Sequence, residues 1–346
     1  MDVISLHDET WQQLSVRRGQ LPHALLLKGP RGIGKFELAQ QFSRSLLCEQ
    51  VTSTHRACGT CAACGWLAQG NHPDFRLLQP EALIEAETEA EGGRDESSRK
   101  KASQQITIDQ IRALDDFLHV GTHRHGARVI LINPAEAMNR ATANSLLKAL
   151  EEPIANTLFL LVSSESDRLL PTIRSRCQTI SIAQASPTLA SEWLRQSGIA
   201  DAERCLALAG GSPLLAVELA KSDERTLIDA LIAEMARGAG IDALAAAASM
   251  EKLLKADKRP GALKRCVEWS QKWLFDLALA GEKLPLRYFV GQGALLDKLA
   301  QESNQRKLLA FNRKALQYKA QCEQPLNSRL FLEAFFLSYA ALFRTA

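Results

Sequence analysis

A glycine-rich segment near the start of this 346-residue chain has the composition and spacing of a loop that binds phosphate. The segment consists of Gly29, Pro30, Arg31, Gly32, Ile33, Gly34 and Lys35. Glycines let backbone N–H groups approach phosphate oxygens, and the lysine adds a positive charge. The next position, which supplies a hydroxyl ligand to Mg²⁺ in an active P-loop, holds Phe36. The segment therefore predicts a phosphate cradle that lacks one metal ligand.

The strand that should carry a second Mg²⁺ ligand also ends without one. In P-loop ATPases a buried strand ends in an aspartate that holds Mg²⁺, and a glutamate often follows to polarise the attacking water. Here the apolar run 129–132 is followed by Asn133, an amide that binds Mg²⁺ poorly, and Pro134, which offers no base. Glu136 stands two residues further on, where a shift along the turn would point its carboxylate elsewhere. We predict negligible ATP hydrolysis by this chain, and whether the loop holds ATP or ADP stays open.

Four of the eight cysteines have the spacing of a metal site. Cys48, Cys58, Cys61 and Cys64 form the pattern C-x9-C-x2-C-x2-C. Four closely spaced thiolates can surround one tetrahedral Zn²⁺ at about 2.3 Å each, and such a closed shell leaves no position for water. The pattern predicts a structural zinc knuckle, and the alternative is a set of free thiols on a loop. The other four cysteines are predicted to be small buried hydrophobic residues, and they are Cys177, Cys205, Cys266 and Cys322.

The elements that must position these groups form an α/β unit. An apolar strand at 24–28 leads into the glycine loop, and helical periodicity follows at 36–47. Short apolar runs are typical of parallel strands buried on both faces. They predict further strands at 74–78, 129–132 and 158–162, with helices at 109–118 and 140–152. Residues 81–105, acidic and then basic, are predicted to be a mobile insertion.

The remaining chain is predicted to be helical. Serine–proline pairs at 186–187 and 212–213 are typical of helix starts and bracket a small helical lid. Amphipathic blocks follow at 227–235, 263–279, 308–318 and 330–342 and predict a helical bundle. Trp269, Trp273 and Phe275 could stack on nucleic acid bases, but their spacing favours a buried helical face.

Composition limits the class of protein. The formal net charge of +3 gives no strong electrostatic sign of nucleic-acid binding, and 46% hydrophobic residues are typical of a globular protein. No apolar run approaches the roughly 18 residues of a membrane span. We therefore expect a cytoplasmic protein that does not contact membranes.

Several motifs together resemble one family. They are the segment 23–26, the glycine loop, the four clustered cysteines, the run 144–153 and the triplet 175–177. These motifs are similar to those of the AAA+ subunits of bacterial sliding-clamp loaders. The resemblance implies three domains: a P-loop AAA+ domain over 1–184 with its zinc module near 48–64, a lid over 185–221, and an all-α collar over 222–346 that assembles with its counterparts.

The resemblance also implies roles for single residues. In the family, the arginine of the Ser-Arg-Cys motif reaches the terminal phosphate of ATP on a neighbouring subunit, which makes Arg176 an arginine finger supplied in trans. Arg174 is close enough to compete for that role. The alternative is that Arg176 caps a helix or pairs with a carboxylate. A nucleotide-sensing arginine of active members is replaced here by Leu214.

These departures favour a subunit that does not hydrolyse ATP. The resemblance implies a stator in a hetero-pentameric loader of the DNA polymerase III holoenzyme, beside motor subunits and a delta subunit. The partners would then include the sliding clamp and, through the complex, primed DNA. One alternative is an active motor subunit of the same loader. Another is a zinc-dependent regulator that binds nucleic acid through its cysteine knuckle.

Overall fold

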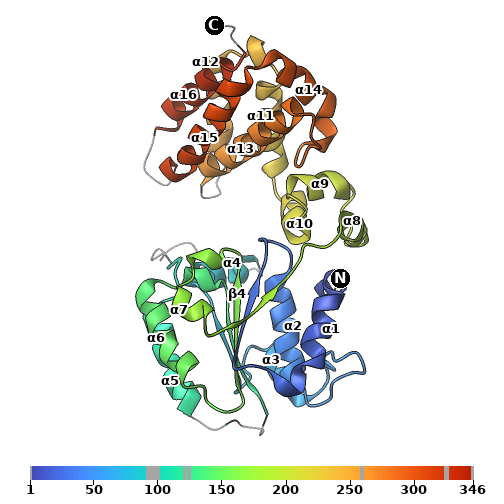
Figure 1. Ribbon diagram of the computed structural model, residues 1–346, viewed down its shortest axis with the longest axis vertical. Helices are drawn as coiled ribbons and strands as arrows, with labels where there is room; N and C mark the ends of the chain where they lie inside the picture. Colours follow the sequence, from blue (N-terminus) through green and yellow to red (C-terminus); the bar gives the residue numbers. More distant parts are fainter. Residues whose placement is uncertain are drawn as a thin grey trace. The chain divides into compact units, whose positions relative to one another are not determined.

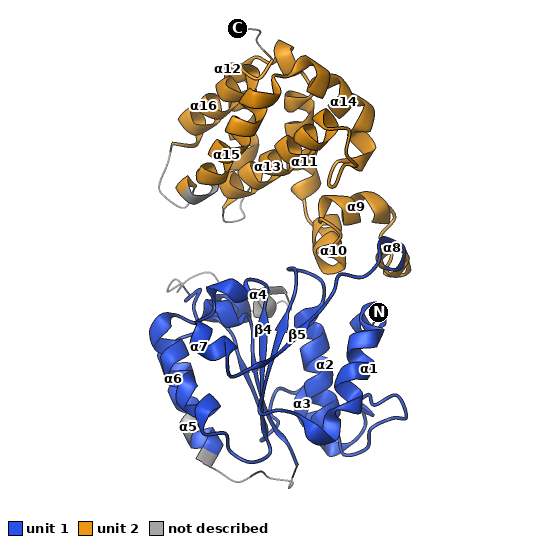
Figure 2. Ribbon diagram, viewed as in Figure 1, with its two compact units in different colours: residues 1–189 blue, residues 190–346 orange. Residues whose placement is uncertain are grey.

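The computed structural model describes residues 2–90, 102–119, 122, 126–257, 261–322 and 327–343. These residues form two compact units, 1–189 and 190–346 (Figure 2). The boundary predicted between lid and collar, at 221/222, lies inside the second unit. We call the units unit 1 and unit 2 and describe each by itself.

Unit 1 is built on a five-stranded parallel sheet with the order β2-β3-β4-β1-β5. The strands are β1 (Ala24–Lys28), β2 (Phe75–Leu78), β3 (Arg128–Ile132), β4 (Thr157–Ser163) and β5 (Gln178–Ser181). Every residue of β3 and β4 is buried, because helices cover both faces of the sheet. The four strands predicted from apolar runs are confirmed. The edge strand β5 was not predicted, since three of its four residues are polar and exposed.

Helices pack on the two faces of this sheet (Figure 1). Leu25 and Leu27 of β1 face a core shared with α1 and α2, whereas Leu26 faces a core shared with α5, α6 and α7. The helices of unit 1 are α1 (Asp8–Val16), α2 (Lys35–Leu47), α3 (Ala62–Ala68), α4 (Glu81–Ala90), α5 (Ile108–His119), α6 (Arg140–Glu151) and α7 (Pro171–Arg174). Short 3₁₀ turns are η1 (Val3–Leu6), η2 (Arg18–Gln20), η3 (Ala135–Ala137) and η4 (Ser166–Arg168).

The segment 81–105 is only partly described. Its first part forms the helix α4, for which no regular structure was predicted. Residues 91–101 lie outside the described residues, so the mobility predicted for this insertion stays a prediction.

All regular secondary structure in the described residues of unit 2 is helical. Its helices are α8 (Pro187–Gln196), which crosses the unit boundary, α9 (Ala202–Leu208), α10 (Pro213–Lys221), α11 (Glu224–Met235), α12 (Ala243–Ala256), α13 (Ala262–Gly281), α14 (Gly293–Glu302), α15 (Gln305–Gln321) and α16 (Ser328–Ala340), with 3₁₀ turns η5 (Gly238–Gly240) and η6 (Val290–Gln292). The predicted helical bundle is confirmed. The helices α12 and α14 were not predicted, and α12 is rich in alanine, which gives little apolar periodicity.

Aromatic side chains of α13 and α16 lie in the core of unit 2. Trp273 donates a hydrogen bond to the Tyr339 hydroxyl at 3.3 Å, and that hydroxyl donates to the Met235 carbonyl at 2.7 Å. Trp269 and Trp273 are buried, as predicted. The same prediction is wrong for Phe275, whose side chain is 43% exposed. Two residues along a helix correspond to a rotation of about 200°, which places Phe275 opposite Trp273.

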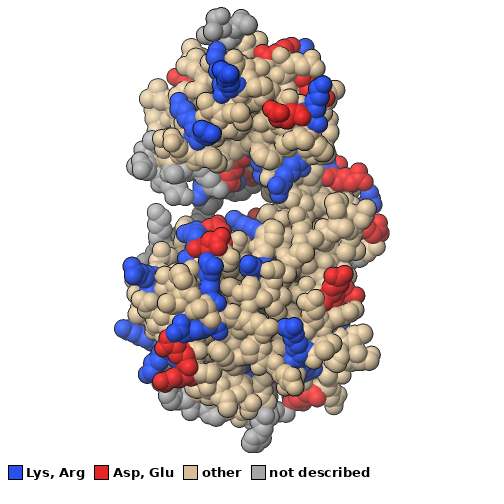
Figure 3. All heavy atoms as spheres, in the orientation of Figure 1, with Lys and Arg blue, Asp and Glu red and all other residues tan. Residues whose placement is uncertain are grey.

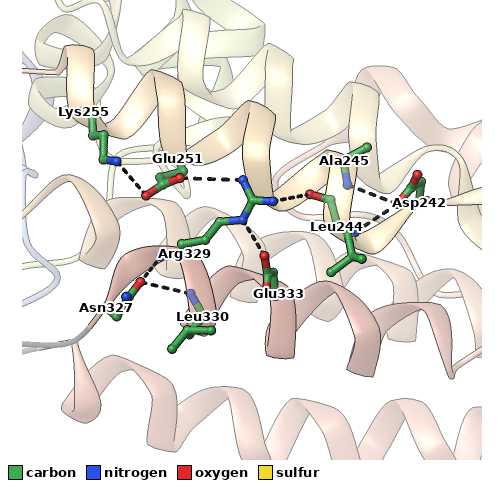
Figure 4. A network of polar contacts seen from close by, with 9 residues as sticks. All are labelled: Asp242, Leu244, Ala245, Glu251, Lys255, Asn327, Arg329, Leu330 and Glu333. Carbon is green, nitrogen blue, oxygen red and sulfur yellow. Dashed lines mark hydrogen bonds and ion pairs between the residues drawn. The ribbon is translucent and has the colours of Figure 1, made fainter.

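A polar network joins α12 to α16 (Figure 4). Arg329 of α16 contacts Glu251 of α12 at 3.7 Å and Glu333 of its own helix at 2.5 Å. Its guanidinium also donates to the Leu244 carbonyl at 3.2 Å. Because Glu251 also pairs with Lys255 at 2.8 Å, the two helices are linked by charge as well as by apolar packing. Side chains cap both helices at their N-termini, and these are Asp242 and Asn327.

The cysteines outside the cluster fit their prediction in three of four cases. Cys177, Cys205 and Cys266 are buried, and Cys322 is half-buried. Burial raises the pKa of the Cys177 thiol to about 11, so this thiol stays protonated at neutral pH.

Candidate functional site

The glycine loop connects β1 to α2, the arrangement that a P-loop requires. Gly32 and Gly34 have φ angles of 74° and 95°, a left-handed conformation that glycine adopts readily. Lys35 is the first residue of α2, and only 4% of it is exposed. The backbone therefore has the geometry of a phosphate cradle, with its lysine at the base of the helix.

The lysine is held by the chain itself. Its Nζ donates to the Pro30 carbonyl at 2.6 Å and to the Ser164 hydroxyl at 3.0 Å. Burial lowers the pKa of Lys35 to about 8, although the negative charge of Glu136 acts in the opposite direction. A phosphate group in this loop would have to compete with two hydrogen bonds for the same ammonium.

Residues from the N-terminus pack over the loop. The Nε2–H of His7 donates to the Ile33 carbonyl, with 2.5 Å between the nitrogen and the oxygen. Burial lowers the pKa of His7, which favours the neutral ring. The Val3 side chain occupies the space that a Cβ on Gly34 would need. The loop is thus packed from outside by a segment that no motif singled out.

The positions that hold Mg²⁺ and activate water in an ATPase carry other groups here. Phe36 packs against the core on the α1 and α2 face of the sheet, and Asn133 and Pro134 follow β3 directly. Glu136 accepts hydrogen bonds from the backbone N–H groups of Ser164 and Glu165 at 2.9 and 3.3 Å. Its carboxylate is therefore engaged by the loop that follows β4. Leu214, at the predicted sensor position, lies in α10 of unit 2.

The four clustered cysteines come together around one point. All four Sγ atoms lie within 4.8 Å of one another, and two pairs are 3.9 and 4.0 Å apart. A tetrahedral metal with bonds of about 2.3 Å separates its sulfurs by about 3.8 Å, so the donor set fits a tetrahedral thiophilic ion. Backbone N–H groups donate to the sulfurs, from Cys61 to Cys58 at 3.3 Å and from Cys58 to Cys48 at 3.2 Å. These four residues can hold a metal ion.

The cluster ties two helices together. Cys48 is the C-cap of α2 and Cys61 the N-cap of α3, while Cys64 lies inside α3. Hydrogen bonds from Thr60 lower the pKa of the Cys58 thiol to about 6, and burial raises that of Cys64 to about 12. A metal held here fixes the far end of the helix that begins at the phosphate loop.

Arg176 lies between α7 and β5, and its side chain is 35% exposed. Its Nη2 is 2.6 Å from a Glu151 carboxylate oxygen at the end of α6. Its Nη1 donates to the Thr172 carbonyl at 3.0 Å and to the Ser175 hydroxyl at 3.4 Å. In this single chain the arginine thus pairs with a carboxylate and caps α7, the alternative arrangement considered from the sequence. Arg174 instead faces Asp167 at 3.4 Å.

Sequence reasoning missed several residues of these sites. No motif marks His7, Val3 or Ser164 as neighbours of the phosphate loop, and the ion pair between Glu151 and Arg176 joins residues of two separate motifs. The run 144–153 was singled out only as part of a resemblance, yet it supplies the carboxylate that holds Arg176.

The fold and the phosphate loop define the class of the protein. A parallel sheet of this order, a P-loop between β1 and α2, an inserted cysteine cluster and a helical C-terminal region make it a P-loop protein of the AAA+ type. A family model described as DNA polymerase III, delta subunit, matches residues 7–186, which is more than half of the chain. The chain belongs to this family.

Curated relatives agree with that assignment. The chain is 40% identical to the DNA polymerase III subunit delta' of Pseudomonas aeruginosa over 63% of its own length and 61% of that protein. It is 33% identical to subunit delta' of Escherichia coli, over 67% of the chain and 66% of the relative. It is also 34% identical to DNA polymerase III subunit tau of Salmonella typhimurium, over 46% of the chain and 21% of that protein.

The similarity has a defined extent. The chain spans less than two thirds of the length of the delta' relatives it matches. Within that extent, the resemblance to clamp-loader subunits predicted from the motifs is confirmed, and it points to the delta-prime type.

Proposed function

We propose that this chain is a non-hydrolysing stator subunit of the DNA polymerase III clamp loader. In that role it supplies Arg176 in trans to ATP on a neighbouring subunit while the sliding clamp is loaded on primed DNA. The observation that carries the proposal is the state of the phosphate loop: its backbone is retained, but Lys35 is bound by the chain's own Pro30 and Ser164. The groups that hold Mg²⁺, activate water and sense the nucleotide are replaced at four positions, and these are Phe36, Asn133, Pro134 and Leu214.

The environment of Arg176 supports a role outside its own chain. A guanidinium forms a rigid fork that matches phosphate oxygens, and an arginine finger accelerates phosphoryl transfer by about 10³ to 10⁵ in other systems. The ion pair with Glu151 joins side chains that are 35% and 49% exposed, and such pairs contribute at most about 1 kcal/mol. A triphosphate carries more negative charge than one carboxylate, so it can displace Glu151.

The proposed partners follow from the family. The subunit would join motor subunits and a delta subunit in a hetero-pentamer, through its helical collar, and would reach DNA through the complex. On the face drawn in Figure 3, basic and acidic side chains are interspersed.

Among the described residues, no helix is both long and apolar enough to cross a bilayer. We place the assembly in the cytoplasm, where replication takes place.

We also propose that the cysteine cluster holds structural Zn²⁺. The proposal rests on four thiol ligands at nearly tetrahedral spacing and on the N–H groups that donate to them. Because all four positions of a tetrahedral ion are then filled by sulfur, the metal has a structural role and does not activate water.

The test of the arginine finger is ATP turnover by the reconstituted loader. Arg176→Ala should leave assembly unchanged, as measured by size-exclusion chromatography, and should lower turnover at the facing ATP site by about 10³. Arg112→Ala is the matched control, since Arg112 is an exposed arginine on α5 whose ion-pair partner among the described residues is Asp109 of its own helix. Unchanged turnover in a fully assembled Arg176→Ala complex would disprove the assignment.

A second candidate is an active motor subunit, which the intact loop backbone and the similarity to subunit tau favour. This alternative predicts substantial ATP hydrolysis by the purified chain, abolished by Lys35→Ala. The stator proposal predicts that neither the purified chain nor its Lys35→Ala variant hydrolyses ATP above background.

A further inference from the structure

A polar cavity of about 380 Å³ lies in unit 1 between the β1–β5 edge of the sheet and α7. It is separate from the phosphate loop, because its walls come from η4, from α7 and its C-cap Ser175, and from one face of β1 and β5. The polar side chains around it are Lys28, Ser166, Asp167, Arg174, Ser175 and Thr179. Neither the phosphate loop nor the cysteine cluster includes any of these groups, which combine two cations, three hydroxyls and one carboxylate.

The charges in the cavity are not balanced. Lys28 is half-buried at the end of β1, and its ammonium has no hydrogen-bond or ion-pair partner among the described residues. Arg174 has one ion-pair partner there, Asp167, at 3.4 Å. The Asp167 side chain is 98% exposed, so this contact is weak and screened by water. Two cations therefore face one cavity with a single, solvated carboxylate between them.

The hydroxyl groups complete a set of donors. Ser166 and Thr179 make no side-chain hydrogen bond with any described residue, so both hydroxyls are available to a ligand. Ser175 accepts a hydrogen bond from Arg176 at 3.4 Å, which connects the cavity to the arginine beside it. A guanidinium, an ammonium and hydroxyl donors around one space match a tetrahedral oxyanion, whose oxygens accept several charge-assisted hydrogen bonds.

We propose that this cavity binds a phosphate group. Lys28 and Arg174 supply the positive charge, and Ser166 and Thr179 supply hydroxyl donors. Asp167 competes with the phosphate for Arg174. The phosphate could be inorganic phosphate or the terminal group of a nucleotide, and both present the same oxygens to these donors. The proposal concerns the single chain and does not depend on the role of Arg176 in a complex.

The experiment is a titration of the purified 346-residue chain with inorganic phosphate at constant ionic strength, measured by isothermal titration calorimetry. Lys28→Gln and Arg174→Gln should each weaken phosphate binding about tenfold, since each removes one charge-assisted contact. Asp167→Asn should strengthen binding about two- to fivefold, because it removes the competing carboxylate. A gain of affinity cannot result from misfolding, so this variant keeps the test decisive if another variant unfolds.

Further variants separate this cavity from its neighbours. Arg112→Gln, at an exposed arginine of α5, is the control and should bind phosphate as the unaltered chain does. Lys35→Gln and Arg176→Gln identify binding that takes place at the phosphate loop or at the adjacent arginine instead. Absence of saturable binding, or binding that is lost only in Lys35→Gln or Arg176→Gln, would overturn the proposal.

A parallel titration with ATP distinguishes the two sources of phosphate. If the terminal group of a nucleotide is the ligand, ATP binds more tightly than inorganic phosphate and shows the same dependence on Lys28 and Arg174. If free phosphate is the ligand, ATP binds no more tightly. Either result supports a phosphate site in this cavity, whereas ATP binding that is insensitive to both substitutions counts against it.

Discussion

The buried ammonium of Lys35 makes a prediction that can be worked out quantitatively. Burial lowers the pKa of this group from 10.5 to about 8, which corresponds to about 3 kcal/mol between its two protonation states. The folded protein therefore releases this proton more readily than the unfolded chain does. Between pH 8 and pH 10.5 the unfolded chain binds more protons, so the stability of unit 1 should rise with pH through this window.

The perturbation that isolates this effect is Lys35→Met, which keeps the length of the side chain and removes the charge. The variant loses two hydrogen bonds of the ammonium, to the Pro30 carbonyl and to the Ser164 hydroxyl. Neither Pro30 nor Ser164 is fully buried, so water can replace the lysine at both. The unfolding free energy of the original protein, relative to the variant, should increase by about 2 kcal/mol from pH 7.5 to pH 10. Below pH 8 the variant should be the more stable protein.

The assay is urea unfolding at several pH values, followed by ¹⁹F NMR of protein labelled with 5-fluorotryptophan. Trp11 is buried in the core beside α2 and reports on unit 1. Lys148→Met, at an exposed position of α6, is the control and should show no such pH dependence relative to the original protein. A difference between the original protein and Lys35→Met that stays constant from pH 7.5 to pH 10 would refute the reasoning.

Three further predictions concern other sites. Asp276→Ala should destabilise unit 2 by about 3 kcal/mol or more in urea unfolding, because this fully buried carboxylate accepts hydrogen bonds from three backbone N–H groups. Its control is Asp297→Ala, at an exposed position, which should change the unfolding free energy by less than about 0.5 kcal/mol. Cys61→Ser should lose the single metal ion measured by atomic absorption, whereas Cys322→Ser retains it. Glu151→Gln should change the unfolding free energy of the chain by no more than about 0.5 kcal/mol and should not lower ATP turnover by the reconstituted loader. A large loss of stability or of turnover would contradict a weak ion pair that another anion can displace.

The parts of the fold that could be predicted are those recorded in short stretches of sequence. The strands β1, β3 and β4 are apolar runs buried on both faces, and the glycine loop and cysteine cluster are local motifs. The strand β5 escaped prediction because an edge strand with polar, exposed residues has no apolar pattern. In the same way, α12 gives only a weak apolar stripe because alanine predominates in it.

The sites were predictable where one segment supplies the residues and unpredictable where distant segments meet. The four cysteines fall within 17 positions of the sequence and were found by their spacing. Lys35 bonds to Ser164 in the loop after β4, and Arg176 pairs with Glu151 of α6. His7, near the N-terminus, bonds to Ile33 of the phosphate loop. Side-chain contacts of that kind follow only from the assembled sheet. Phe275 shows the remaining limit, since its spacing from Trp269 and Trp273 was assigned to one buried helical face, although Phe275 lies about 200° around the helix from Trp273.

If Arg176 acts on a neighbouring subunit as proposed, its contact with Glu151 has a consequence for how subunits associate. The side chains of Arg176 and Glu151 are 35% and 49% exposed, so exchanging the carboxylate for another anion replaces one partly solvated pair by another and changes the free energy of the chain by at most about 1 kcal/mol. The ion pair limits the rotamers of Arg176 in the free chain. It is nevertheless weak enough for a more strongly binding anion to displace Glu151. In the proposed loader, the affinity between neighbouring subunits then comes from contacts other than Arg176, and Arg176 pairs with whichever anion binds it more strongly.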